Sequence, residues 1–129
     1  MSRAVLDTSI LIANEQDRPL QRSLPDQVAI SVVTIAELEL GVLVAADPDT
    51  RARRLRTLGE ARALTAALPI DERTASAYAE LAARTLAAGR KPRIHDTWIA
   101  ATALVNQTEV WTQDQDFTDF AGAVAVVHV

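Results

Sequence analysis

Three aspartates stand within six positions of the stretch VWTQDQDFTDF, residues 110–120, directly after a short apolar segment. Asp114, Asp116 and Asp119 lie where a strand is expected to end. Such a stretch is either a solvated loop or a place where carboxylates are gathered to bind a cation. Asp119, the last of the three, is expected to face solvent.

Acidic residues occupy equivalent places elsewhere in the chain. Asp7 directly follows the first apolar segment, Glu37 lies just past the second, and Asp96 stands at the start of a predicted helix. In an open α/β sheet, ligands bind at the carboxyl ends of the strands. Helix N-termini also stabilise nearby negative charge. The acids are therefore predicted to converge on one edge of a sheet.

Each acid also has a structural explanation when it is taken alone. These explanations are helix capping for Asp7 and Asp114, a capping box of Thr34 with Glu37, a first-turn position for Asp96 and a turn position for Asp116. Together they are less satisfactory, because four or five carboxylates on one edge repel each other and resist burial. A divalent cation removes this repulsion, and oxygen-only ligands favour Mg²⁺ or Mn²⁺ over Zn²⁺.

The segments that must position these acids alternate between strand and helix patterns. Short, uniformly apolar segments predict buried strands at 3–6, 28–33, 109–111 and 123–127. Helical periodicity predicts helices at 34–46, 49–67, 71–89 and 95–107, with Asp71 capping the third. This alternation predicts one α/β domain over residues 1–129, a mostly parallel sheet of about four to five short strands with helices on both faces.

The composition narrows the possible classes of protein. The chain has 129 residues, of which 49% are hydrophobic, and this suits one folded domain. It has no cysteine and two histidines, which argues against disulfides, thiolate metal sites and a histidine-rich zinc site. No apolar run is long enough to span a bilayer, and Asp7 interrupts the apolar N-terminal stretch, so a cytoplasmic protein is expected.

Charge is distributed unevenly along the chain. The net charge of −4 argues against a protein that binds nucleic acid by overall electrostatic attraction. Two basic stretches, RARRLR at 51–56 and GRKPR at 89–93, stand out in this acidic sequence. Both suit solvated helix faces or ends, and both are alternatively candidate contacts for phosphate groups.

Four segments, in order along the chain, resemble the four motifs of the PIN domain. They are VLDTSIL at 5–11, TIAELELG at 34–41, HDTWIAATAL at 95–104 and WTQDQDF at 111–117. More narrowly, the chain is similar to the VapC toxin branch of bacterial type II toxin–antitoxin pairs. Each motif alone has low specificity, but the ordered set covers nearly the whole chain and is specific.

The resemblance implies a Mg²⁺- or Mn²⁺-dependent endoribonuclease that cuts structured RNA, either transfer RNA or ribosomal RNA. The matching acids are Asp7, Glu37, Asp96, Asp114 and Asp116, and the matching small polar residues that support them are Thr8, Ser9 and Thr112. Asp7 and Asp96 would hold the principal ion, Glu37 and Asp114 would complete its shell, partly through waters, and Asp116 matches an additional acid that many members have. The resemblance leaves open whether one or two ions bind.

The resemblance also implies partners. VapC-like proteins form homodimers and are blocked by a VapB-like antitoxin, commonly through a basic side chain directed at the acidic site. The apolar residues Leu11, Leu40 and Leu43 are candidates for the antitoxin groove, with core packing as the alternative. Three basic residues just before Asp96 are expected to guide RNA phosphates; they are Arg90, Lys91 and Arg93. His95 is expected to be a surface residue at a helix start.

The hypothesis for the mechanism is attack of a metal-bound water on a phosphorus of the RNA backbone. Departure of the 3′-oxygen would leave 5′-phosphate and 3′-hydroxyl ends. An HD-type phosphohydrolase would need further histidines, and an EF-hand loop starting at Asp114 would have Asp119 in place of glycine. The remaining alternative is a non-catalytic, metal-binding PIN scaffold that acts as a partner-binding module.

Overall fold

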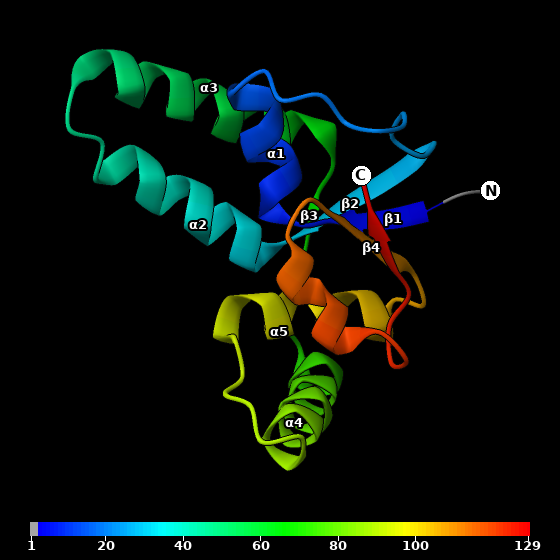
Figure 1. The fold of residues 1–129 in the computed structure, drawn as a ribbon. Helices are drawn as coiled ribbons and strands as arrows, with labels where there is room; N and C mark the ends of the chain where they lie inside the picture. Colours follow the sequence, from blue (N-terminus) through cyan, green and yellow to red (C-terminus); the bar gives the residue numbers. More distant parts are fainter. Residues whose placement is uncertain (1–2) are drawn as a thin grey trace.

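The computed structural model describes residues 3–129 and shows a sheet with helices on both sides (Figure 1). The strands are β1 (Arg3–Leu6), β2 (Gln27–Ser31), β3 (Ala67–Leu68), β4 (Glu109–Thr112) and β5 (Val126–His128). They lie in the order β3-β2-β1-β4-β5, and every pairing is parallel. The predicted α/β class and the mostly parallel sheet are confirmed.

Helices connect successive strands. They are α1 (Thr8–Glu15), α2 (Val32–Leu43), α3 (Pro48–Leu64), α4 (Glu72–Ala87), α5 (Ile94–Val105) and the short 3₁₀ helix η1 (Gln115–Phe120). The sheet divides the interior into two cores, because successive side chains of a strand point to opposite faces. One core holds Ala4 and Leu6 with residues of α1, α2 and α3, and the other holds Val5 with residues of α4, α5 and η1. Among residues 3–129, no helix combines the length and apolarity that crossing a membrane requires.

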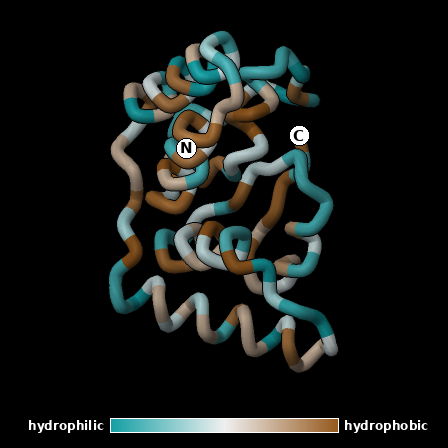
Figure 2. The backbone as a smooth tube through the Cα atoms, turned by 90° about the vertical axis from the view of Figure 1, so that its left-hand side faces the viewer, coloured by the Kyte–Doolittle hydropathy of each residue, from teal (hydrophilic) through white to brown (hydrophobic). Residues whose placement is uncertain are grey.

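Helix α4 illustrates how the sequence selects a buried face. Asp71 caps the helix by accepting a hydrogen bond from the Thr74 backbone N–H at 2.9 Å, as predicted. Thr74, Ala77, Leu81 and Thr85 then follow at intervals of three or four residues and are buried. Figure 2 shows the resulting alternation of hydrophilic and hydrophobic residues along this helix at the bottom of the view. The packing of α4 against α5 fixes the helix that carries Asp96.

The start of α2 differs from the prediction. The second strand ends at Ser31, whose hydroxyl accepts a hydrogen bond from the Val33 backbone N–H at 3.0 Å and caps the helix. Thr34 therefore lies inside α2 and is fully buried. The predicted capping box of Thr34 with Glu37 is wrong, because Ser31 supplies the capping oxygen about one turn earlier.

Two further boundaries differ at the edges of the sheet. Strand β3 is absent from the prediction, which ends a helix at Ala67, because a strand of two residues leaves no alternating pattern. The segment 123–125 precedes β5 as a turn and coil rather than as part of the strand. Neither difference moves an acidic residue away from the central strands.

Helices α2 and α3 pack side by side and extend away from the sheet (Figure 1). Leu40 and Leu43 are exposed on this extension, as are Val44 and Leu55. Leu11 is instead buried in the core beneath α1 and α3. The predicted apolar surface is therefore formed by α2 and α3 alone. Leu11 does not contribute to it, and its alternative role in core packing is confirmed.

Candidate active site

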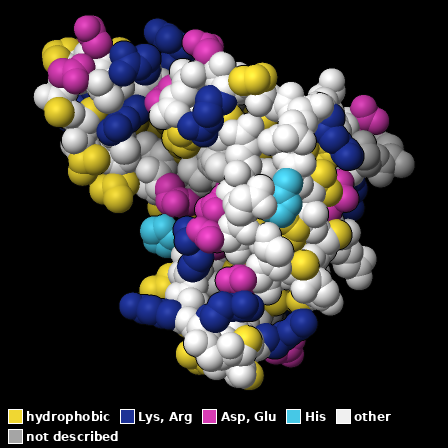
Figure 3. Space-filling model, viewed as in Figure 1, with side chains coloured by type: hydrophobic (Ala, Val, Ile, Leu, Met, Phe, Trp, Pro, Cys, Tyr) yellow, Lys and Arg dark blue, Asp and Glu magenta, His cyan; other side chains and the backbone are white. Residues whose placement is uncertain are grey.

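The acidic residues lie at the carboxyl edge of the three central strands. Asp7 follows β1, Asp114 follows β4 by two residues, and Glu37 lies in the helix that follows β2. Because β1 is flanked by β2 and β4, these three positions meet at one edge, and the N-terminus of α5 brings Asp96 to them. Figure 3 shows acidic and basic side chains side by side in the hollow between the α2–α3 extension and the lower helices.

Asp7 is the buried centre of the site. It caps α1, and one of its oxygens accepts from the Ser9 backbone N–H at 3.3 Å and from the Thr112 hydroxyl at 2.9 Å. Asp7 is 4% exposed. Burial raises its pKa, and this effect outweighs the hydrogen bonds, which act in the opposite direction. Asp7 is therefore both the predicted cap and a carboxylate whose charge is poorly compensated by the protein.

Thr112 links Asp7 to the segment that carries Asp114. Its hydroxyl donates to Asp7 and accepts from the Asp114 backbone N–H at 2.9 Å, and it lies 3.2 Å from the Ser9 hydroxyl. Ser9 Oγ in turn accepts from the Gln113 backbone N–H at 3.0 Å. The two small polar residues therefore fix the spacing between the ends of β1 and β4.

Glu37 is oriented by two threonines. The Thr8 hydroxyl donates to Glu37 Oε1 at 2.7 Å and lies 3.0 Å from the Thr34 hydroxyl. Because the single hydroxyl hydrogen of Thr8 is directed at Glu37, Thr34 must donate to Thr8. Thr34 is the supporting residue that the sequence reasoning assigned to another role. His95 is exposed as expected, and its Nδ1 lies 3.4 Å from Glu37 Oε2.

The remaining acids surround one guanidinium. Arg93 Nε donates to Asp96 Oδ2 at 2.7 Å. Arg93 Nη2 lies 3.6 Å from Asp114 Oδ2, and Arg93 Nη1 contacts Asp116. Asp114 also caps η1 by accepting from the Asp116 backbone N–H at 2.9 Å. Burial raises the pKa of Asp96, and the negative charges of Asp7 and Asp114 raise it further. The hydrogen bond from Arg93 lowers it but does not cancel these effects.

The carboxylate oxygens of the site suit a divalent cation, although they do not converge on one coordination position in this structure. Among residues 3–129, no group of three or more acidic, histidine or cysteine side chains is placed to hold a metal ion as it stands. The oxygen donors are nevertheless those that Mg²⁺ and Mn²⁺ prefer, and burial raises the pKa of both Asp7 and Asp96. Glu37, Arg93, His95 and Asp96 line an adjoining cavity of about 470 Å³.

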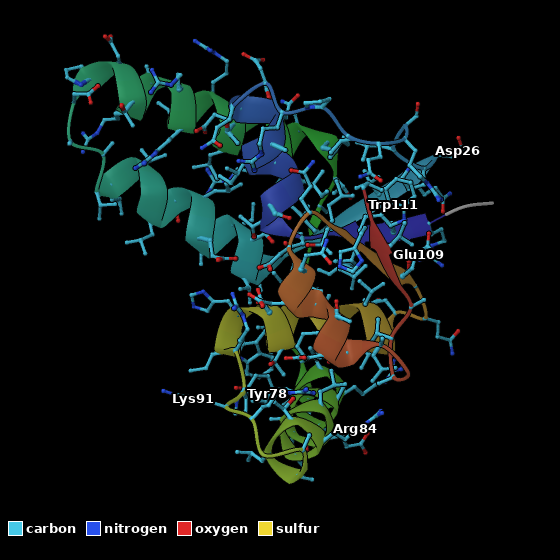
Figure 4. The ribbon with its side chains drawn as sticks, in the orientation of Figure 1. Asp26, Tyr78, Arg84, Lys91, Glu109 and Trp111 are labelled. Carbon is cyan, nitrogen blue, oxygen red and sulfur yellow. The ribbon has the colours of Figure 1, made fainter. Side chains whose placement is uncertain are left out.

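The basic residues before α5 have different surroundings. Arg90 lies 3.5 Å from Asp119, so the exposed Asp119 is paired as well as solvated. Lys91 projects outward from the loop before α5 and is exposed (Figure 4). Arg93 points into the acidic group instead, which the sequence reasoning did not anticipate. The spacing of three residues between Arg93 and Asp96 is the signal that would have indicated this pair.

The chain is similar to known proteins over most of its length. The family model described as "PIN domain" matches residues 4–123. Ribonuclease VapC5 of Mycobacterium tuberculosis (strain ATCC 25618 / H37Rv) is 49% identical over 123 residues, which cover 95% of this chain and 90% of that protein. Ribonuclease VapC4 of the same strain is 42% identical over 120 residues, covering 89% and 88%.

Solved structures agree with the sequence comparisons. The crystal structure of VapBC-5 from Mycobacterium tuberculosis, a member of the VapBC family of toxin–antitoxin systems, matches with a TM-score of 0.85 and 42% identity, covering 100% of this chain and 98% of that one. FitAcB from Neisseria gonorrhoeae matches with a TM-score of 0.75 and 30% identity, covering 96% of both chains. The chain therefore belongs to the PIN domain family, and within it to the VapC-like toxin ribonucleases of bacterial toxin–antitoxin systems.

Proposed function

We propose that this VapC-like ribonuclease is a Mg²⁺- or Mn²⁺-dependent endoribonuclease that cuts structured RNA. The observation that carries the proposal is the convergence of buried and half-buried carboxylates on the carboxyl edge of β1, β2 and β4. When bound there, a divalent cation lowers the pKa of a water molecule and polarises the phosphodiester. The cation also supplies the positive charge that lets an acidic site, in a chain of net charge −4, accept the RNA polyanion.

The residues of the site have distinct roles in this proposal. Asp7 and Asp96 hold the principal cation, because these two carboxylates have pKa values raised by burial and gain most from a nearby positive charge. Glu37 and Asp114 complete its surroundings, and Asp116 is the peripheral acid that supports a second ion. Thr8, Ser9, Thr34 and Thr112 hold the carboxylates in orientation through the hydrogen bonds described above.

The chemistry of the product ends tests this reaction. Attack by water on phosphorus with departure of the 3′-oxygen leaves a phosphate on the 5′ end of the downstream fragment. Sequencing libraries whose adapters ligate only to 5′-phosphates should therefore capture the cut sites without prior kinase treatment. Fragments that carry 2′,3′-cyclic phosphates would contradict the proposal, because they arise from attack by the RNA 2′-hydroxyl.

The substrate is proposed to be transfer RNA or ribosomal RNA, recognised mainly through its shape and backbone. The chain has five aromatic residues, and Trp111, Phe117 and Phe120 are buried, so little surface is left for stacking on bases. Arg90 and Lys91 at the approach to α5 are the proposed phosphate contacts, and Arg93 contributes when its guanidinium is not engaged with the acids.

Substituting Lys91 with glutamine is expected to weaken RNA binding to a similar extent for all sequences. The plot of log affinity against log salt concentration should become shallower by about one unit, because one phosphate contact releases about one counterion. The measurement is fluorescence anisotropy with an Asp7→Asn background that prevents cleavage. Arg62→Gln is the control, since Arg62 is paired with Glu39 on the distant α2–α3 extension. If the salt dependence of RNA binding is the same for Lys91→Gln as for the parent, Lys91 is a solvated surface residue and not a phosphate contact.

A VapB-like antitoxin is the proposed protein partner. VapBC-5, to which this chain is similar in sequence and structure, is a member of the VapBC family of toxin–antitoxin systems. The exposed apolar residues Leu40, Leu43, Val44 and Leu55 on the α2–α3 extension offer an apolar docking surface. A homodimer is proposed on the family resemblance, and light scattering of the purified chain tests it.

The alternative is a non-catalytic PIN scaffold that binds metal and partner without cutting RNA. Saturable Mn²⁺ binding without any cleavage of transfer RNA or ribosomal RNA would support this alternative.

A further inference from the structure

The guanidinium of Arg93 occupies the position that a cation would take among three of the proposed ligands. It hydrogen-bonds Asp96 at 2.7 Å, contacts Asp116 and lies 3.6 Å from Asp114. In each contact the carboxylate oxygen is Oδ2. The same lone pairs cannot serve the guanidinium and a divalent cation together, because both are cations that approach within bonding distance.

The backbone of Arg93 is anchored at the start of α5, whereas its side chain is half exposed and held only by its contacts with the acids. Its carbonyl oxygen accepts from the Thr97 backbone N–H at 2.9 Å and from the Thr97 hydroxyl at 2.5 Å, which anchors the residue at the start of α5. Its side chain provides no capping hydrogen bond for α5 and is 51% exposed. Ion pairs in such exposed positions contribute little individually, so a stronger cation can displace them.

Asp7 is bound by other residues than this arginine. Its hydrogen bonds come from Ser9 and Thr112, and no ion pair between Arg93 and Asp7 occurs among residues 3–129. Asp7 and Asp96 are nevertheless close enough for the charge of one to raise the pKa of the other. The site therefore offers two carboxylates that Arg93 does not engage, Asp7 and Glu37, beside three that it does.

We propose that Arg93 is an internal competitor for the metal site, whose guanidinium must leave Asp96, Asp114 and Asp116 before a divalent cation binds there. This inference rests on the proposed metal-dependent function. Arg93 holds the acids together when divalent cation is scarce, and it sets the cation concentration at which the enzyme becomes active. Once displaced, its positive charge remains at the mouth of the site, next to the path of the RNA backbone.

Replacing Arg93 with glutamine is expected to tighten Mn²⁺ binding by about tenfold, because the competing cation is removed while the carboxylates remain. Isothermal titration of the chelator-treated chain with MnCl₂ measures this affinity without reference to RNA cleavage. Arg93→Lys retains the charge but loses the planar fork that spans three acids, so its affinity should fall between those of Arg93→Gln and the wild type.

Arg62→Gln provides the matched control. Arg62 is equally exposed and forms a 3.0 Å ion pair with Glu39 outside the site, so its loss should leave Mn²⁺ affinity unchanged. An affinity of Arg93→Gln equal to or weaker than that of the wild type would overturn the proposal and make Arg93 a static part of the site. If Arg93→Gln does not fold, Arg93→Lys takes its place, and an Mn²⁺ affinity of Arg93→Lys equal to or weaker than that of the wild type would overturn the proposal.

Asp96→Asn separates this inference from the proposed function. If Asp96→Asn abolishes Mn²⁺ binding while Arg93→Gln leaves it unchanged, the metal site stands and only the competition is refuted. If Asp96→Asn binds Mn²⁺ as the wild type does, the cation lies elsewhere, and both the competition and the proposed active site are refuted.

Discussion

Replacing Asp7 with asparagine is expected to reduce RNA cleavage by roughly a thousandfold or more while leaving the fold intact. Losing a ligand of the catalytic cation removes several kcal/mol of transition-state stabilisation, and about 4 kcal/mol corresponds to this factor. Asparagine retains the cap of α1, and its carbonyl oxygen can accept the hydrogen bonds from Ser9 and Thr112. Initial rates of cleavage of a defined RNA in saturating Mn²⁺ measure the effect.

The same substitution is expected to stabilise the protein in the presence of EDTA. Burial raises the pKa of Asp7, so the folded state carries an unfavourable charge at neutral pH that asparagine removes. An increase in Tm of about 2–4 °C at pH 7 is expected, on the order of 1 kcal/mol. Loss of activity together with a gain in stability distinguishes a catalytic carboxylate from a structural one.

The pH dependence has a definite sign. As the pH falls from 7 toward 3.8, the folded wild-type chain protonates Asp7 before the unfolded chain does, because the folded pKa is the higher one. The wild type therefore gains stability relative to Asp7→Asn in this range, and the advantage of the variant should disappear. Thermal melts of both proteins at several pH values measure the difference.

Asp47→Asn is the matched control for this pair of effects. Asp47 also caps a helix, but it is fully exposed, and the hydrogen bond from the Thr50 backbone N–H lowers its pKa. Its substitution should give no gain in stability and no loss of cleavage. A decrease in Tm for Asp7→Asn in EDTA would contradict the account of Asp7 as a poorly compensated charge.

Replacing Phe117 with alanine is expected to cost about 3–5 kcal/mol of unfolding free energy, the usual range for a large aromatic core residue. Phe117 is fully buried in the core between α4, α5 and η1, with its ring 5.6 Å from that of Phe120. It directly follows Asp116 in the segment that carries Asp114. The substitution should therefore also weaken Mn²⁺ binding, because the anchor of this acidic segment is lost.

Urea unfolding at pH 7 measures the change in stability for Phe117→Ala. Leu86→Ala is the control, since Leu86 is 63% exposed and its truncation should change the free energy of unfolding by less than about 0.5 kcal/mol. A loss below about 1 kcal/mol for Phe117→Ala would show that η1 does not depend on this side chain for its position.

The sequence indicated the central elements of the fold because their patterns are long or repeated. The predicted helix 71–89 corresponds to α4, and the acids after the first and third predicted strands lie at the edge that parallel strands share. The sequence did not predict a residue's role where two nearby residues suit the same role equally well. Ser31 and Thr34 are both good capping residues, and only the path of the chain after β2 selects Ser31.

The position of Arg93 was beyond the reach of sequence patterns for a related reason. Its spacing from Asp96 indicates a local ion pair, but its contacts with Asp114 and Asp116 join residues that are distant in the chain. Such contacts depend on how α5 and η1 are placed around the sheet. The sequence alone can therefore indicate the pair with Asp96, but not the contacts of Arg93 with Asp114 and Asp116.

The most direct test of the central claim is RNA cleavage measured while Mn²⁺ is added stepwise to the EDTA-treated, antitoxin-free chain, with Mg²⁺ in parallel. Discrete cuts in transfer RNA or ribosomal RNA should appear with the metal, disappear when EDTA is restored, and be missing throughout for Asp96→Asn. Cuts of equal intensity in EDTA, or cuts that persist in Asp96→Asn, would contradict the assignment of this carboxylate edge as a metal-dependent ribonuclease site.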